Sequence, residues 1–418
     1  MKNGKRNKII ICISMIVCML AMTGCTTFDN FRYTFIDEKA TDENTIYIGV
    51  FEPQTGADAE KGKEEIKGIE LANTIYNNVN GYNVELIKVD TQSKSKSAKT
   101  AIENLIKMKP VAIIGSCGEA TSLIASEYIE DAKIPAITPS AVNPLITQDN
   151  GYYFRACITD AQMGAGVAEY VYQNLKSKKI AIVDLKNDST VAAFLKGFDD
   201  RMDKMTGTAP DPVVLRTSTT ITNDSWGKLI KEIKASRADT VFLPLTVDQM
   251  DSFLTAAEKS GLSGVTFVGT KTWGTTKFAA MADKHKKFNV AFPYDTVIND
   301  ERSITDTVTK ETQRFMIEYA NKYGDDDLPS QRAALGYDSY LLVINAINNA
   351  KSTDGAAIRK ALASLNGIQG ATGIFKFDES GNTIRTVNIA TIRDGKIVSD
   401  YVTKGTTDAG SIEAIEEK

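Results

Sequence analysis

The side chains that most often perform catalysis or bind metals are scarce in this chain. Its single histidine, His285, lies in a polar run at 283–287, and the sequence contains no CxxC or HExxH motif. A zinc site or a Ser-His-Asp triad would have to use this histidine, so we expect no metal, no cofactor and no enzyme activity. The enzymatic alternative is a surface hydrolase with Glu119 and Asp160 as acid and base, but nothing in the sequence fixes their separation.

Cys25 is the cysteine whose surroundings indicate chemistry. It follows a basic segment at 2–8, an apolar run at 9–20 and the residues Met22-Thr23-Gly24. This order is typical of a secretory signal, and twelve apolar residues are too few for a permanent membrane span. The small residues before the cysteine resemble the lipobox of bacterial lipoproteins, whose thiol is acylated. We therefore expect a signal peptide at 1–24 and an exported chain anchored to the bacterial membrane through Cys25, at the cell surface or in the periplasm; the alternative is an ordinary signal peptide with a chance cysteine.

Net charge and cysteine content limit the partners and the fold. The formal charge is −4, and the signal contains four cations and no acid, which leaves −8 on the mature chain. An acidic chain argues against nucleic acid or an anionic membrane surface as a partner. After removal of the signal and acylation of Cys25, only Cys117 and Cys157 remain. They could form one disulfide, but two buried thiols are the preferred interpretation.

Apolar runs alternate with amphipathic stretches twice along the chain. A polar tether at 25–44 precedes them. The first series predicts strands near 46–51, 84–89, 111–115 and 134–138, with helices near 66–79, 98–108 and 119–131. The second predicts strands near 179–184, 213–216, 240–243 and 265–268, with helices near 190–204, 225–235 and 250–260. Repeated βαβ units indicate α/β architecture with parallel, doubly wound sheets.

The end of the chain predicts how the two sheets are joined. After a strand at 288–292, helices are expected near 304–323, 331–350 and 355–365, followed by a hairpin around Asp394-Gly395. This late return of helices predicts two lobes joined by several chain crossings, with a hinge and a ligand cleft. We expect the first lobe at 45–156 plus about 294–366. The second is expected at 157–293 plus about 367–403, followed by a tail at 404–418.

Several motifs in register carry a family resemblance. They are Ile48-Gly49-Val50, Gly68-Ile69-Glu70-Leu71-Ala72, Pro135 to Pro144, Tyr153-Phe154-Arg155, Gly336-Tyr337-Asp338 and Phe377-Asp378-x-x-Gly381. In this order they resemble the leucine/isoleucine/valine-binding type of ABC-transporter substrate-binding protein, with the class I periplasmic binding fold. The resemblance implies a monomer that captures an amino-acid-like or other small polar or organic-acid solute by lobe closure and delivers it to a membrane permease. The ligand-binding half of a sensory system is the alternative.

The resemblance also implies where a ligand binds, and here the chain departs from the pattern. In the family's amino-acid binders, a serine after the third strand and a threonine turn after the fourth hold the α-carboxylate and ammonium of the ligand, and an acid of the second lobe completes the ammonium site. Those positions fall on Glu119, Val142 and Lys271. The other candidate ligand-binding residues are Lys61, Cys117, Thr121, Ser122, Ser140, Ser189, Thr246 and Trp273.

The departures reverse the charges expected for a zwitterionic amino acid. Glu119 would repel a carboxylate and Lys271 would repel an ammonium, so a ligand with a donor toward Glu119 and an acceptor toward Lys271, bound against Trp273, fits better. Thr121 and Ser122, one turn on, could supply the missing hydroxyl. Other interpretations remain open: Glu119 near a helix start also suits the helix dipole, and Lys271 could be a solvated loop charge.

Overall fold

The computed structural model describes residues 44–186, 188–219, 226–294, 309–324, 327 and 329–403, and the backbone of 406–407 and 410–411. The expected signal peptide, Cys25, nearly all of the tether and most of the tail lie outside these residues. Of the helices that are described, none is both long enough and apolar enough to cross a membrane.

The first sheet has six strands in the order β2-β3-β1-β4-β5-β6. Its strands are β1 (Thr45–Glu52), β2 (Asn78–Val79), β3 (Tyr82–Asp90), β4 (Ala112–Ile114), β5 (Ala136–Thr138) and β6 (Tyr153–Arg155). The pairs β1–β4, β4–β5 and β5–β6 are parallel, so these four strands end at one edge of the sheet. The helices are α3 (Ala59–Ile75), α4 (Ser95–Lys107), α5 (Glu119–Ala132), α11 (Lys310–Tyr323), α12 (Gln331–Ala350) and α13 (Gly355–Ala363), with a short 3-10 turn, η2 (Pro144–Ile146).

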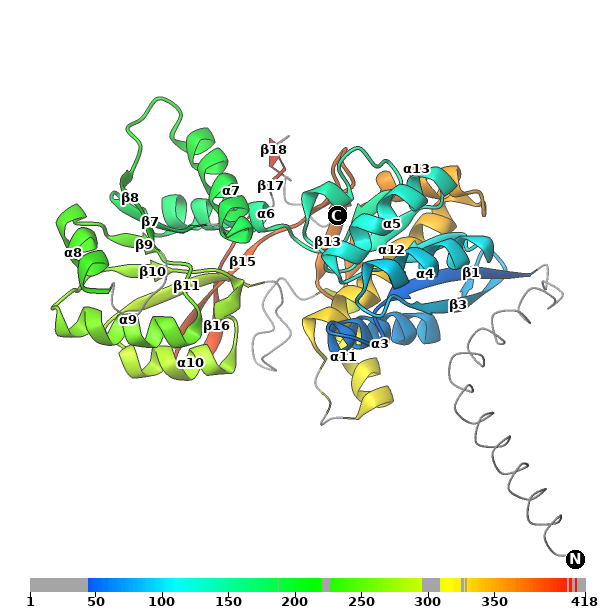
Figure 1. Ribbon diagram of the computed structural model, residues 1–418, viewed down its shortest axis with the longest axis horizontal. Coiled ribbons are helices and arrows are strands. Elements are labelled where there is room, and N and C mark those ends of the chain that lie inside the picture. The colour runs from blue at the N-terminus through cyan, green and yellow to red at the C-terminus, as the bar shows by residue number, and fades with distance from the viewer. Residues whose placement is uncertain are drawn as a thin grey trace, which may run out of the picture. The chain divides into compact units, whose positions relative to one another are not determined.

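These helices cover both faces of the first sheet (Figure 1). Strand β1 shows why: Ile48 and Val50 join a core with α3, α11, α12 and α13, whereas Phe51 joins the core beneath α4 and α5. Alternate side chains of a strand point to opposite faces, and both faces are apolar here. The strand therefore requires a helical layer on each side, as the alternating pattern predicts.

The second sheet has seven strands in the order β16-β15-β11-β10-β9-β7-β8. They are β7 (Ile180–Leu185), β8 (Val213–Thr219), β9 (Thr240–Phe242), β10 (Thr266–Val268), β11 (Asn289–Tyr294), β15 (Asn388–Arg393) and β16 (Lys396–Val402). Its helices are α6 (Asp160–Glu169), the π-helical turn η3 (Tyr170–Asn174), α7 (Ser189–Thr206), α8 (Trp226–Ser236), α9 (Val247–Lys259), η5 (Lys271–Trp273), α10 (Thr276–Ala282) and η6 (Asp283–His285). One core holds α6 and α7 against the sheet, and another holds α8, α9 and α10 (Figure 1).

The expected lobe boundary near residue 366 is wrong. Strands β12 (Asn366–Gly370), β13 (Gly373–Phe377) and β14 (Thr383–Ile384) form a separate sheet. Phe375 and Phe377 lie in the first core, and Phe377 packs edge-on against Phe154 of β6 at 5.3 Å. Only β15 and β16 join the second sheet, because the apolar side chains of β13 are buried by the first lobe. A short antiparallel pair, β17 (Thr406–Thr407) and β18 (Gly410–Ser411), follows.

Helices α3 and α12 approach each other through glycine on both sides. A β-carbon on Gly68 would lie 1.7 Å from the carbonyl oxygen of Ala333, and one on Gly336 would lie 2.2 Å from that of Glu65. No side chain fits at either position. This contact brings Glu65 of α3 and the first turn of α12 together beneath the strand ends.

Asp338 joins α12 to the turn between β12 and β13. Its carboxylate accepts the N–H groups of Ala371 and Thr372, the latter at 2.9 Å, and its complete burial raises its pKa to about 6. A raised pKa means that the folded state holds the proton more tightly than the unfolded chain. Protonated Asp338 therefore stabilises the folded state below the pKa of Asp338 in the unfolded chain, which is near 4. This stabilisation is lost as the pH rises through about 6, the pKa in the folded state.

We expect Asp338→Asn to flatten the dependence of stability on pH between about 4 and 6. Asparagine cannot titrate, and a shift of this size corresponds to at most about 3 kcal/mol. Denaturant unfolding of both proteins across this pH window measures the effect. An equal slope in the variant would show that Asp338 does not titrate in this range.

Candidate functional site

The candidate residues of the first lobe lie at the carboxyl ends of parallel strands. Strand β4 ends at Ile114 and leads through 115–118 into α5, while β5 ends at Thr138 and leads through 139–143 into η2. Open α/β sheets bind ligands at this edge. In the second sheet, Ser189, Thr246 and Lys271 likewise follow the ends of β7, β9 and β10.

Glu119 forms a clip between the two loops of the first lobe. As the first residue of α5, it lies at a helix N-terminus, and its carboxylate oxygens accept the N–H groups of Val142 and Asn143, each at 2.8 Å. The side chain is exposed, so the clip lies at the surface of this edge. A carboxylate of this protein therefore already occupies two adjacent backbone donors of the turn after β5.

The hydroxyls expected to substitute for a ligand-binding serine serve the loop itself. Thr121 donates to the carbonyl of Gly118 at 2.9 Å, and Ser122 donates to the carbonyl of Ser116 at 2.9 Å. Both side chains are buried. The two residues shape the loop after β4, and their hydroxyls are directed into it.

Beneath these loops lies a charged cluster that the sequence prediction did not include. Glu52 ends β1, Glu65 lies on α3, and both are fully buried. Glu65 accepts hydrogen bonds from Ser140 and from Arg332 of α12, the latter at 3.2 Å, and Arg332 also donates to Ser140 at 2.6 Å. Cys117 donates its N–H to Glu52 at 2.8 Å. The predicted residues Ser140 and Cys117 thus belong to a network with buried acids.

The sequence did contain a signal for this cluster. Glu52 ends the apolar run at 46–51, and Glu65 lies one turn before Ile69, on the apolar stripe of its helix. A charged residue on a core-facing position is rare unless it is paired. Burial raises the pKa of both acids, with the charge of Glu65 adding to the effect on Glu52, while Arg332 and Ser140 partly offset it for Glu65. Burial also raises the pKa of the Cys117 thiol.

In the second lobe, Lys271 is paired within its own half of the chain. Its ammonium lies 3.6 Å from the carboxylate of Asp160, the first residue of α6. The Lys271 side chain is 37% exposed and that of Asp160 is 9% exposed, so the pair presents mainly its cation to solvent. Since Glu119 is bound to backbone and Asp160 to a lysine, the contacts of both acids favour structural pairing over the acid–base pair of a hydrolase.

The expectation that Trp273 walls the ligand site is wrong in this structure. Its ring is completely buried, stacks on Phe278 at 4.6 Å, and donates its N–H to the carbonyl of Leu245 at 2.7 Å. The ring packs into the core of the second lobe, and its polar atom is satisfied there. It has no surface left for a ligand in this conformation.

Three further candidates lie on exposed helix starts. Lys61 pairs with Asp58 at 2.8 Å, Ser189 begins α7, and Thr246 caps α9. All three are exposed, and Val142 is half-buried. The structure places them at strand-end loops as expected, without contacts that assign them to a ligand. Cys117 and Cys157 are both buried thiols that are not joined in a disulfide, which confirms the preferred interpretation.

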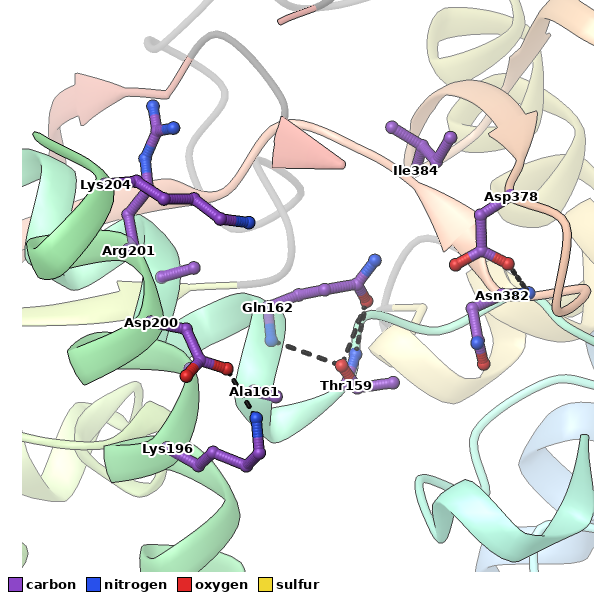
Figure 2. A pocket seen from close by; sticks show the side chains of 12 residues that line it. Thr159, Ala161, Gln162, Lys196, Asp200, Arg201, Lys204, Asp378, Asn382 and Ile384 are labelled. Atoms are coloured by element: carbon purple, nitrogen blue, oxygen red, sulfur yellow. Dashed lines mark hydrogen bonds and ion pairs between the residues drawn. The ribbon is translucent and has the colours of Figure 1, made fainter. Parts of the chain in front are cut away.

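A separate pocket lies beside a chain crossing (Figure 2). It has a volume of about 200 Å³ and is bounded by the start of α6, by α7 and by the turn at 378–382. Lys196 and Asp200 of α7 form an ion pair at 2.5 Å on one wall, and Asp378 binds the backbone of its own turn opposite (Figure 2). None of the predicted ligand-binding residues lines this pocket.

Comparison with known proteins gives matches along almost the whole described chain. A family model described as periplasmic binding protein matches residues 45–396. An amino acid binding protein of Pseudomonas aeruginosa is 29% identical over 202 residues, which are 47% of this chain, and the chain spans only about half (53%) of that relative. Leu/Ile/Val-binding protein homolog 7 of Brucella abortus is 26% identical over 85% of this chain and 91% of its own length.

A solved structure has the same fold. It is an ABC-transporter solute binding protein from R. palustris in complex with benzoate. The match has a TM-score of 0.62 and 19% identity, and covers 87% of this chain and 98% of that protein. At this identity the likeness establishes the two-sheet α/β fold.

Proposed function

Because the chain belongs to the periplasmic binding protein family, we propose that it is the solute-binding component of an ABC transporter and that it captures a small polar or organic-acid solute between its two lobes. The observation that carries this proposal is the placement of the polar candidate residues at the carboxyl ends of the strands of both parallel sheets. Binding that favours a closed arrangement of the lobes would present a new surface to a membrane permease. We further propose that the protein acts as a monomer outside the cytoplasm.

The proposed hinge consists of the segments that pass between the sheets. Residues 156–159 connect β6 to α6, and residues 385–387 connect β14 to β15. The connection from β11 to α11 lies outside the described residues. Short connections of this kind permit hinge bending while each lobe keeps its own core.

The contacts at the strand ends favour a ligand other than a branched-chain amino acid. The N–H groups of Val142 and Asn143 are taken by Glu119, whose charge also repels a second carboxylate. Lys271 keeps part of its surface exposed beside Asp160, so it can meet an acceptor of the ligand. The benzoate complex of the R. palustris protein supports the proposal, since it shows that a protein of this fold can bind an organic acid.

Native mass spectrometry of protein purified from cells tests the proposed function by identifying a retained solute. We expect that solute to bind in calorimetry and to lower the radius of gyration in small-angle scattering, whereas a solute that does not bind leaves the scattering unchanged. Binding without any change in the scattering would contradict lobe closure. A solute that is converted during incubation would instead identify an enzyme.

Cys25 is proposed as the lipid attachment site, from the signal and lipobox-like residues before it. Stable membrane anchoring requires two lipid chains or equivalent signals, and diacylglycerol with an N-acyl chain supplies more than two. We expect Cys25→Ser to abolish acylation, so that the membrane fraction no longer holds mature lipoprotein. Detergent partitioning and mass analysis of the N-terminus measure this, with Cys117→Ser as the matched control. Acyl mass on the N-terminus of the Cys25 variant would refute the proposal.

A further inference from the structure

Two buried carboxylates face each other beneath the loops after β4 and β5. One oxygen of Glu52 accepts a hydrogen bond from the N–H of Cys117. One oxygen of Glu65 accepts hydrogen bonds from the side chains of Arg332 and Ser140. The remaining oxygens, Glu52 Oε1 and Glu65 Oε2, are buried without a hydrogen-bonding partner among the described residues. A carboxylate oxygen from each acid and the sulfur of Cys117 lie within 4.8 Å of one another.

The charges around this pair do not balance if both acids are ionised. Among the described residues, Arg332 on α12 is the cation that faces them, and its side chain is 35% exposed. The other titratable groups against the pair are the thiol of Cys117, after β4, and the phenol of Tyr153, on β6, and burial raises the pKa of both so that they stay neutral. Two adjacent buried carboxylates with one partly exposed cation would cost several kcal/mol.

A single proton accounts for both the unpartnered oxygens and the excess negative charge. Placed on either acid, it makes a donor for the unpartnered oxygen of the other, and it lowers the charge of the pair to −1, which Arg332 balances. A carboxyl–carboxylate pair of this kind is the usual outcome when two acids share a dry site.

We propose that Glu52 and Glu65 hold one proton between them and form a proton-binding site that keeps the ligand-facing edge of the first lobe in place. Glu52 is bonded to the loop that leads to Glu119, and Glu65 to Ser140 and Arg332. Loss of the proton at alkaline pH makes the two acids repel each other, which separates the loops they hold. The proton site itself does not depend on any ligand. That separation of the loops changes ligand affinity is an inference that rests on the proposed function.

The proposal is tested by infrared spectroscopy of the full mature chain from pH 5 to 9. We expect the carbonyl band of a protonated carboxyl group to persist above pH 7, where Asp338 is ionised. Glu52→Gln should remove it, because the amide supplies the donor that the proton supplied, whereas Glu85→Gln, at an exposed position on β3, should leave it unchanged. Glu65→Gln serves the same purpose if Glu52→Gln does not fold.

Thermal unfolding gives a second readout. The wild type should lose roughly 3–8 °C of unfolding temperature between pH 6 and 9, and the loss should be smaller in Glu52→Gln. A spectrum without the band, or a band that survives both glutamine variants, would overturn the proposal. So would stoichiometric zinc that raises the unfolding temperature of the wild type alone, since the cluster would then be a metal site. None of these measurements requires a ligand, so their failure is distinct from failure of the solute-binding function.

Discussion

Gly68→Ala is expected to destabilise the protein by about 3 kcal/mol or more, which is a large fraction of the stability of a typical domain. The new β-carbon would lie 1.7 Å from the carbonyl oxygen of Ala333, which is backbone and cannot rotate away. The whole of α12 must therefore move from α3. Because the reciprocal contact joins Gly336 to the backbone of Glu65, the same movement displaces the buried acid pair beneath the strand ends.

A matched control is Gly227→Ala in α8, where a β-carbon would meet nothing within 4 Å. Alanine has a higher helix propensity than glycine, so this change should be neutral or stabilising by up to about 1 kcal/mol. Denaturant unfolding compares the two variants. Gly336→Ala should resemble Gly68→Ala, and the double variant should cost less than the sum because one helix displacement relieves both contacts. Similar stability of the Gly68 and Gly227 variants would contradict the close packing.

Much of the fold could be predicted because local patterns and burial agree. The helix predicted at 331–350 is α12, which has these bounds and is buried along the continuous stretch Ala333 to Ile344. The hairpin at Asp394-Gly395 joins β15 to β16 with positive φ at both residues, as a tight two-residue turn requires. Helix α6 was not predicted, because it is buried on most sides and contains Gly164 and Gly166, which weaken an amphipathic pattern.

The candidate site could be predicted only in part. Strand ends and the loops after them follow from the alternating pattern, so Glu119, Ser140 and Lys271 were placed on the correct edges. Their partners depend on tertiary structure, since the N–H groups that Glu119 binds are backbone groups with no side-chain signature. Arg332 meets Glu65 across 267 residues, a pairing that no local pattern reveals. Trp273 was misplaced because an aromatic residue after a strand can turn toward either the cleft or the core.

The wild-type protein is expected to bind leucine, isoleucine and valine weakly or not at all. Glu119 occupies the two backbone donors of the turn after β5 and adds a negative charge where an α-carboxylate would have to bind. Calorimetry with each amino acid measures this directly. Micromolar or tighter binding of any of the three would show that these donors are not the determinant of ligand class.

Glu119→Ser combined with Val142→Thr should increase the affinity for leucine by about tenfold or more, that is by about 1.4 kcal/mol. The double change frees the N–H groups of Val142 and Asn143 and supplies two hydroxyls. Lys271→Glu would work against this gain, because the new acid would face Asp160, which lies 3.6 Å from the lysine. Val142→Thr alone is the control: it adds a hydroxyl while Glu119 still holds the backbone donors, so it should gain little. An equal gain from the single and double variants would mean that the clip has no part in specificity, and no gain from either would mean that the ligand binds elsewhere on this edge.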